Sequence, residues 1–278
     1  MQGSDIPFAI KLSNQEKWGT TRIDFERLLN LSPRGCFIAY HGRRKVGLTT
    51  TTRYGKRLAW IGNVVVDKDF RGKNVGHQLV EHAIAYLQKL RVEHIGLYCF
   101  KRNVSFYEDL GFAEDTQFLR LHRKPKRITF RTVPPDLGPA ISLKRLLWAD
   151  RRAFGADRSR LIRLVLSTGA GWHVGSAQNS TGISYLLVKD YHDMYEYGPW
   201  VNIRTRRDLP TKILLQILAK TQSKPIEVTC LRDNAQAVTL FKAHDFRVME
   251  EGYRMYFGRK AHIAEDRAQY ALGFLDKG

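Results

Sequence analysis

The sequence predicts an α/β protein built from two similar halves, each with a central sheet flanked by helices. Short apolar runs such as residues 94–100 are typical of strands. Residues 75–90 instead place apolar side chains at steps of three and four, as an amphipathic helix does. Both halves repeat one order of elements: strand, helix, strand, short helix, strand. We therefore expect an internal repeat of about 130 residues.

The first half, residues 1–125, contains one readable set of elements. A helix is expected over residues 17–33, where Pro33 ends it. Turn residues at 41–42 and 54–55 separate three strand candidates, and Gly111 caps a short helix. The expected strands are residues 35–42, 43–58, 59–67, 94–100 and 118–124, and the further helices are residues 75–90 and 103–112.

A proline-rich segment separates the halves. Residues 125–139 hold four prolines and a glycine, so we expect a linker over residues 126–139 and a second domain over residues 140–278. That domain repeats the order of the first more loosely. Its expected helices are residues 142–154, 158–169, 209–220 and 234–246, and its expected strands are 171–177, 182–190, 195–203, 225–233 and 252–260.

The composition of the chain limits the classes of protein to which it can belong. The net charge of +19 is spread as +11 over residues 1–127 and +8 over residues 128–278. Such charge attracts anionic partners, although a generally basic solvated surface explains it equally well. Three well-separated cysteines, Cys36, Cys99 and Cys230, give neither a disulfide framework nor metal-ligand spacing, and Cys99 is expected in the core. No stretch approaches the roughly 18 apolar residues of a membrane helix, and the start lacks a signal-peptide pattern. We expect a soluble, cytoplasmic protein without a metal.

The stretch Val64 to Gly76, VVVDKDFRGKNVG, has the layout of an anion-binding loop. A strand of valines leads through a basic loop into a helix, whose first N–H groups and positive dipole end favour phosphate oxygens. Arg71 and Lys73 add positive charge. The P-loop spacing and the dinucleotide-binding glycine pattern are both absent. The loop alone predicts only a general anion site.

Two motifs make the loop more specific. Val64 and Val66 precede Arg71, with Asn74 and Gly76 at two glycine positions; residues 107–112 then read Tyr-x-x-x-Gly-Phe. In this order, residues 35–112 resemble the Gcn5-related N-acetyltransferase (GNAT) superfamily. The resemblance implies two tandem GNAT-like α+β domains, each a mixed, mostly antiparallel central sheet flanked by helices. The first would be catalytic, and the second a degenerate auxiliary domain.

The resemblance implies that acetyl-CoA is the co-substrate. Its pyrophosphate would bind the loop, and its pantetheine arm would pair with the backbone of the strand before the loop. Asn74 departs from the usual glycine, but Asn is well tolerated in the left-handed conformation that a glycine there implies. The residues assigned to acetyl-CoA are Val64, Val65, Val66, Arg71, Gly72, Lys73, Asn74, Val75 and Gly76.

The resemblance also assigns chemistry. Tyr107 stands at the position of the general acid that protonates the leaving thiolate, although it can instead pack against the cofactor. Many relatives use a Glu on the strand before the loop as base, but here only Asn63 is available. A water relay, Asp24 or Glu26 are the alternatives, and the two carboxylates fit a solvated helix face better.

The second half lacks the corresponding residues. Phe241 replaces the tyrosine and Asp245 the glycine, and Pro210 has no amide hydrogen where the phosphate loop belongs. We expect this half to be non-catalytic and to wall the acceptor cleft, with the aromatic residues 191–200 either lining that cleft or packing in the core.

Two classes of function follow. The first is an N-acetyltransferase that acts on a primary amine of a protein, a peptide or a small molecule, with an acidic or anionic acceptor favoured by the charge. The second is a non-catalytic acyl-CoA sensor or a basic nucleic-acid-binding module, although no nucleic-acid motif supports the latter. The protein is expected to be a monomer or a homodimer.

Overall fold

The computed structural model describes residues 1–127, 140–167, 171–177, 182–258 and 263–278. Most of the expected linker, residues 128–139, thus lies outside the described residues. The chain forms two compact units with bounds that differ from the sequence division. Unit 1 holds residues 1–115, 254–261 and 275–278, whereas unit 2 holds residues 116–253 and 262–274.

The sheet of unit 1 has the strand order β1-β2-β3-β4-β10-β5. The strands β1 to β3 are antiparallel, and β4 runs parallel to β3. The strands are β1 (Cys36–His41), β2 (Arg44–Tyr54), β3 (Leu58–Val66), β4 (His94–Phe100), β5 (Phe112–Arg123) and β10 (Arg247–Phe257). The helices are α1 (Ile6–Asn14), α2 (Arg22–Leu31), α3 (Val75–Lys89) and α4 (Val104–Glu108).

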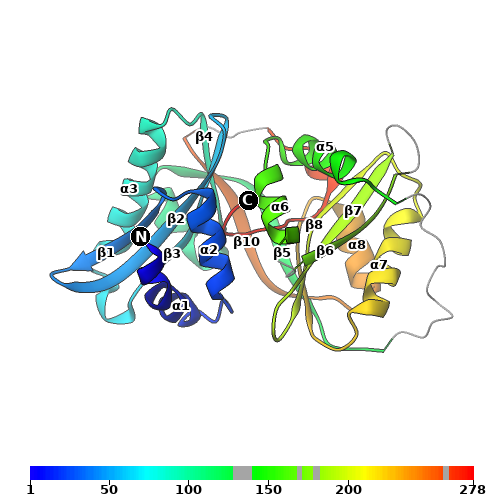
Figure 1. Ribbon diagram of the computed structural model, residues 1–278, viewed down its shortest axis with the longest axis horizontal. Helices are drawn as coiled ribbons and strands as arrows, with labels where there is room; N and C mark the ends of the chain where they lie inside the picture. The colour runs from blue at the N-terminus through cyan, green and yellow to red at the C-terminus, as the bar shows by residue number, and fades with distance from the viewer. Residues whose placement is uncertain (128–139, 168–170, 178–181, 259–262) are drawn as a thin grey trace. The chain divides into compact units, whose positions relative to one another are not determined.

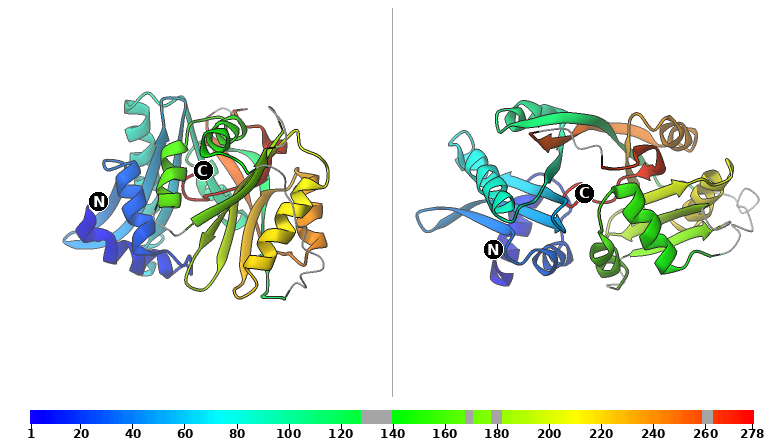
Figure 2. Two further views of the ribbon diagram at one scale, coloured as in Figure 1. Left: turned by 45° about the vertical axis from the view of Figure 1, so that its right-hand side comes forward. Right: turned by 90° about the horizontal axis from the view of Figure 1, so that it is seen from above.

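Helices cover both faces of this sheet (Figure 2). On one face, Leu12 of α1 and Phe25 of α2 pack with Leu48 and Val65 in a buried cluster. On the other face, α3 approaches β2 closely, because a Cβ added at Gly47 would lie 3.0 Å from Leu79 Cδ1. The expected mixed sheet flanked by helices is confirmed.

In unit 2 the same sheet continues in the order β10-β5-β9-β8-β7-β6, and β11 pairs with β8. Its strands alternate between two cores: Tyr185 and Val201 face α5 and α6, whereas Leu186 and Trp200 face α7 and α8. The remaining strands are β6 (Gly171–Ala177), β7 (Ile183–Asp190), β8 (Tyr195–Ile203), β9 (Ile226–Leu231) and β11 (Gln269–Ala271). The helices are α5 (Leu143–Phe154), α6 (Ser159–Ser167), α7 (Leu209–Lys220) and α8 (Ala235–Ala243), as Figure 1 shows.

Long-range strand pairing explains the different unit bounds. Both β5 and β10 begin in one unit and end in the other, since β10 lies between β4 and β5. No local signal in residues 254–261 or 275–278 assigns them to the first unit, so the sequence placed them in the second domain. The sequence also left α1 and β11 unassigned.

The expected helix over residues 17–33 is shorter than predicted. It begins after Thr21, whose side chain and Asp24 form a reciprocal capping box, and Lys17 and Gly19 adopt positive φ. Among the described residues, no helix is both long and apolar enough to cross a membrane.

Candidate active site

The two central strands of unit 1 separate along their length. β3 and β4 pair in parallel at Leu58–Trp60 and His94–Gly96. Past Trp60 and Gly96 the described residues of these strands form no further pairs with each other, although β3 continues to Val66. The facing edges therefore carry backbone donors and acceptors that can pair with a bound extended molecule.

A β-bulge lies on β3 within this separated part. Leu48 on β2 opposes Val65, but Thr50 opposes Gly62, so β3 has one more residue than β2 between these pairs. Asn63, within the bulge, is left-handed, with φ +50°. Its side chain reaches back to β2, where Nδ2 donates a hydrogen bond of 3.0 Å to Thr50 Oγ1.

The loop after β3 enters α3 through a left-handed residue. Asn74 is the N-cap, with φ +60° and ψ +7°, which confirms the conformation expected from its glycine position. Its side chain forms no capping hydrogen bond. The N–H groups of Val75 and Gly76 therefore lie at the helix N-terminus, where the dipole favours an anion.

Two basic side chains of the loop, Arg71 and Lys73, are engaged within unit 1. Arg71 Nε donates to the carbonyl of Val66 at 3.1 Å, and its guanidinium forms an ion pair with Glu16. Lys73 Nζ donates to the carbonyl of Asp69 at 2.9 Å. Arg71 thus braces the loop against the end of β3, a role that sequence reasoning did not assign to it.

Gly76 lies in tight packing. A Cβ there would lie 3.3 Å from the ring of Phe106 and 3.8 Å from Val66 Cγ2. The ring of Phe106 also contacts His77, with centroids 4.7 Å apart. The segment that carries Tyr107 therefore packs directly on the first turn of α3.

Tyr107 lies on α4 and is only 8% exposed. Its ring makes edge contacts with Phe106 and Phe112, at centroid distances of 4.9 and 5.9 Å. Burial raises the pKa of the Tyr107 hydroxyl well above its usual value, with a smaller contribution from the nearby Cys99 thiol. The phenol is thus held in its protonated form, as a hydrogen-bond donor requires.

Neither of the two expected alternative carboxylates is poised as a base. Asp24 accepts hydrogen bonds from the backbone and hydroxyl of Thr21 at 2.9 and 2.7 Å, which cap α2. It also lies 3.6 Å from Arg27. Glu26 is 52% exposed and faces Arg22 one turn away. Glu26 thus lies on the solvated helix face that the sequence favoured, whereas Asp24 is buried at the start of α2, so the solvated-face prediction is wrong for Asp24.

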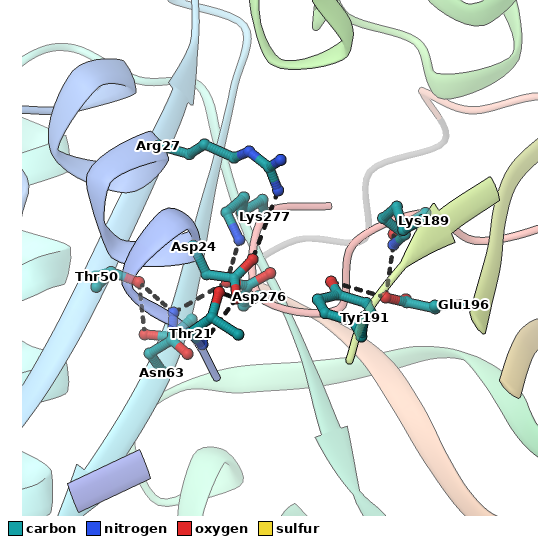
Figure 3. A network of polar contacts seen from close by, with 12 residues as sticks. Thr21, Asp24, Arg27, Thr50, Asn63, Lys189, Tyr191, Glu196, Asp276 and Lys277 are labelled. Carbon is teal, nitrogen blue, oxygen red and sulfur yellow. Dashed lines mark hydrogen bonds and ion pairs between the residues drawn. The ribbon is translucent and has the colours of Figure 1, made fainter. Parts of the chain in front are cut away.

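A third carboxylate, which sequence reasoning missed, lies beside the bulge. Asn63 Nδ2 donates to Asp276 Oδ2 at 3.1 Å, and Lys277 Nζ lies 2.5 Å from the same oxygen (Figure 3). The hydroxyl of Tyr54 donates to the carbonyl of Lys277. No motif marks these residues, and the closest signal is Gly62, where a Cβ would lie 2.1 Å from the Asp276 carbonyl oxygen.

Unit 2 fills the corresponding gap with its own chain. β8 and β9 pair in parallel at Tyr195–Tyr197 and Ile226–Val228 and then part. Between them, β11 pairs with β8, with Gln269 opposite Val201, and Leu272 bridges to Thr229 on β9. Counted from the last parallel pair in each unit, Val201 corresponds to Val64.

The degenerate motif positions of unit 2 are structural. Phe241, at the tyrosine position, is fully buried against Trp200 and Phe246. Asp245, at the glycine position, keeps a left-handed conformation with φ +67°. Pro210 occupies the first turn of α7, where an anion site needs N–H groups. In unit 2 these positions therefore serve core packing, a left-handed turn and the start of a helix.

The aromatic run at residues 191–200 divides between core and surface. Tyr197 and Trp200 are fully buried in unit 2, and Tyr195 packs partly buried against the same core. Core packing therefore accounts for these three rings. Within the described residues, no group of three or more His, Cys, Asp or Glu side chains is arranged to hold a metal ion.

Both halves match one family. Residues 8–112 match the acetyltransferase (GNAT) family, and residues 146–271 match an acetyltransferase (GNAT) domain. Among solved structures, a Pyrococcus horikoshii protein provisionally named an acetyltransferase superposes with a TM-score of 0.79 at 21% identity, over 100% of this chain and 94% of that chain. A tandem GNAT protein from the clavulanic acid biosynthesis pathway superposes with a TM-score of 0.67 at 15% identity, over 91% of this chain and 95% of that chain.

The chain therefore belongs to the GNAT superfamily of acetyltransferases and carries two such domains in tandem. N-alpha-acetyltransferase 30 of Dictyostelium discoideum is 32% identical over 100 residues, 34% of this chain and 54% of that protein. An uncharacterized N-acetyltransferase of Bacillus subtilis is 26% identical over 189 residues, 64% of each protein. The chain thus spans about half to two thirds of these curated relatives. The expected family, tandem fold and acetyltransferase class are confirmed at the level of the family.

Proposed function

We propose that the chain is an N-acetyltransferase that transfers the acetyl group of acetyl-CoA directly to a primary amine in unit 1. The observation that carries this proposal is the open separation of β3 and β4, which leads through the left-handed Asn74 to the N-terminus of α3. A single ligand with an extended amide arm and a pyrophosphate fits such a surface.

The position of the loop at the end of β3 supports one direction for the ligand. The pyrophosphate would accept from backbone N–H groups around Gly72 to Gly76, and the arm would run back along the free edge of β3 from Val66 toward Val64. The thioester then lies near the bulge at Asn63. There the backbone N–H of Val64 is the proposed donor that polarises the thioester oxygen.

Tyr107 supports the second half of the reaction. When the amine attacks, the carbon–sulfur bond breaks and negative charge appears on sulfur. A buried phenol that stays protonated donates a hydrogen bond to this thiolate, and proton transfer completes the step. Because its pKa is raised, stabilisation by the hydrogen bond precedes full transfer.

The test begins with binding. Acetyl-CoA should raise the melting temperature of the protein, and Arg71→Ala combined with Gly76→Asp should abolish the shift. The aspartate places a negative charge and a side chain at the helix N-terminus, and the alanine removes the brace on Val66. No shift at millimolar acetyl-CoA would refute the proposal.

Turnover separates an enzyme from a sensor. Coenzyme A release is followed over a panel of small amines, polyamines and peptides with free N-termini, which the similarity to N-alpha-acetyltransferase 30 makes informative. Tyr107→Phe should bind acetyl-CoA within about twofold of wild type but turn over about 100-fold more slowly. Binding with no turnover of any amine would favour the sensor, and equal turnover in Tyr107→Phe would remove the acid role.

A further inference from the structure

We propose that Asp276 supplies the carboxylate that accepts the proton of the acceptor amine, so that a residue near the end of the sequence completes the active site of unit 1. This inference rests on the proposed acetyl transfer and deepens it. It assigns the base that the strand before the loop lacks, where Asn63 stands.

The position of Asp276 follows from the bulge. The proposed thioester lies at Asn63 and Val64, and the amine must approach the same point. Asp276 Oδ2 accepts from Asn63 Nδ2 at 3.1 Å, although 213 residues separate the two in sequence. Its side chain is 29% exposed, so solvent and a substrate can reach the carboxylate.

The segment that carries Asp276 is held by contacts specific to this place. Its backbone occupies the space beside Gly62, where a Cβ at position 62 would collide with the Asp276 carbonyl. The buried hydroxyl of Tyr54 fixes the carbonyl of Lys277, and the side chain of Lys277 is only 6% exposed. These contacts set the carboxylate in one position, which proton transfer requires.

Several titratable and charged groups lie around the carboxylate of Asp276. The ammonium of Lys277 faces it at 2.5 Å, and Cys36 on β1 lies within electrostatic reach of both residues. The Asp24–Arg27 pair of α2 is drawn in the same close view (Figure 3). A cationic amine that enters this surface exchanges one positive partner of Asp276 for another.

The proton balance is simple. Asp276 takes one proton from the ammonium form of the acceptor and passes it to solvent. The neutral nitrogen bonds to the thioester carbon, and the carbon–sulfur bond breaks with its electron pair on sulfur. The second nitrogen proton reaches sulfur by way of Tyr107. The products are the amide, the thiol of coenzyme A and one released proton.

The test compares Asp276→Asn with the exposed-carboxylate control Glu93→Gln over a range of pH. Asp276→Asn keeps the size and an acceptor oxygen, so acetyl-CoA should bind within about twofold of wild type. At neutral pH kcat/KM should fall about 100-fold or more, as for loss of a general base. The deficit should shrink as pH rises and the acceptor loses its proton unaided. Glu93→Gln should match wild type.

Each outcome decides the question. An unchanged pH profile in Asp276→Asn, with Tyr107→Phe still impaired, overturns the inference and leaves the proposed function intact. If wild type acetylates no amine, the proposed function itself fails. If Asp276→Asn loses acetyl-CoA binding, Lys277→Met decides instead, because it keeps the carboxylate. Its maximal rate should be retained, with the acid limb of kcat/KM moved to higher pH. An unmoved limb refutes the role of Asp276.

Discussion

The backbone N–H of Leu272 donates a hydrogen bond of 2.7 Å to the carbonyl of Thr229, in the gap that opens between β8 and β9. With β11 paired to β8 beside it, this bond gives the parted strands of unit 2 partners from their own chain. The matching edges of unit 1 have no such strand among the described residues. The two domains thus share a fold, but only one presents an open edge.

The first prediction concerns stoichiometry. Because β11 fills the edge of β8 at Val201, which corresponds to Val64, we expect one acetyl-CoA per chain. Isothermal titration calorimetry should give a single site, and Arg71→Ala with Gly76→Asp should remove it completely. A second site, or one that survives this double substitution, would contradict the assignment of unit 1.

The second prediction concerns Asn74. A left-handed backbone costs a residue with a Cβ about 1–2 kcal/mol, and more for a branched side chain, while glycine adopts it freely. Asn74→Gly should bind acetyl-CoA as well as wild type, whereas Asn74→Val should bind about tenfold more weakly. Titration of both variants checks this. Equal affinity in Asn74→Val would show that the loop tolerates another conformation.

The third prediction concerns Gly62. The Cβ of Gly62→Ala would collide with the backbone carbonyl of Asp276, so the segment at residues 275–278 must move. Acetyl-CoA binding should persist while turnover falls at least tenfold. Gly3→Ala, which meets nothing within 4 Å, is the matched control and should retain activity. Full activity in Gly62→Ala would separate this segment from catalysis.

The fourth prediction concerns alkaline stability. Burial raises the pKa of the Cys36 thiol from 9.0 to about 11 and that of Cys230 from 9.0 to about 12. A thiol is neutral when protonated, so this stabilisation is complete below pH 9. Above pH 9 the thiols ionise in the unfolded state but stay protonated in the folded state. Each thiol should therefore lower the free energy of unfolding by about 1.4 kcal/mol per pH unit until its folded pKa is reached.

Denaturant unfolding at pH 8 and 10.5 measures this loss. Cys230→Ala removes one of the two thiols, so its unfolding free energy should fall by about 2 kcal/mol less than that of wild type between the two pH values. The cavity left by alanine lowers the unfolding free energy equally at both pH values, so it does not affect the change that is compared. Parallel curves for the two proteins would show that Cys230 titrates alike in both states.

Much of the candidate site could be predicted from local sequence patterns. The helix at α3 and the strands β3 and β4 follow from side-chain periodicity, because burial of one face acts over a few residues. The left-handed Asn74 follows from its own backbone preference. The roles of Arg71 and of Gly76 were less accessible, since each depends on a contact made elsewhere in the chain, with Glu16 and with Phe106.

By itself, then, the sequence determined most of the elements, the tandem repeat, the left-handed turn at Asn74 and the absence of a tyrosine at Phe241. The tertiary structure decided that β3 and β4 part while β8 and β9 close on β11, and that Asp276 meets Asn63. The physical reason is the distance along the sequence over which each interaction acts. Helix periodicity and turn conformation are properties of neighbouring residues, whereas strand pairing and a carboxylate placed 213 positions away depend on which distant segments pack together.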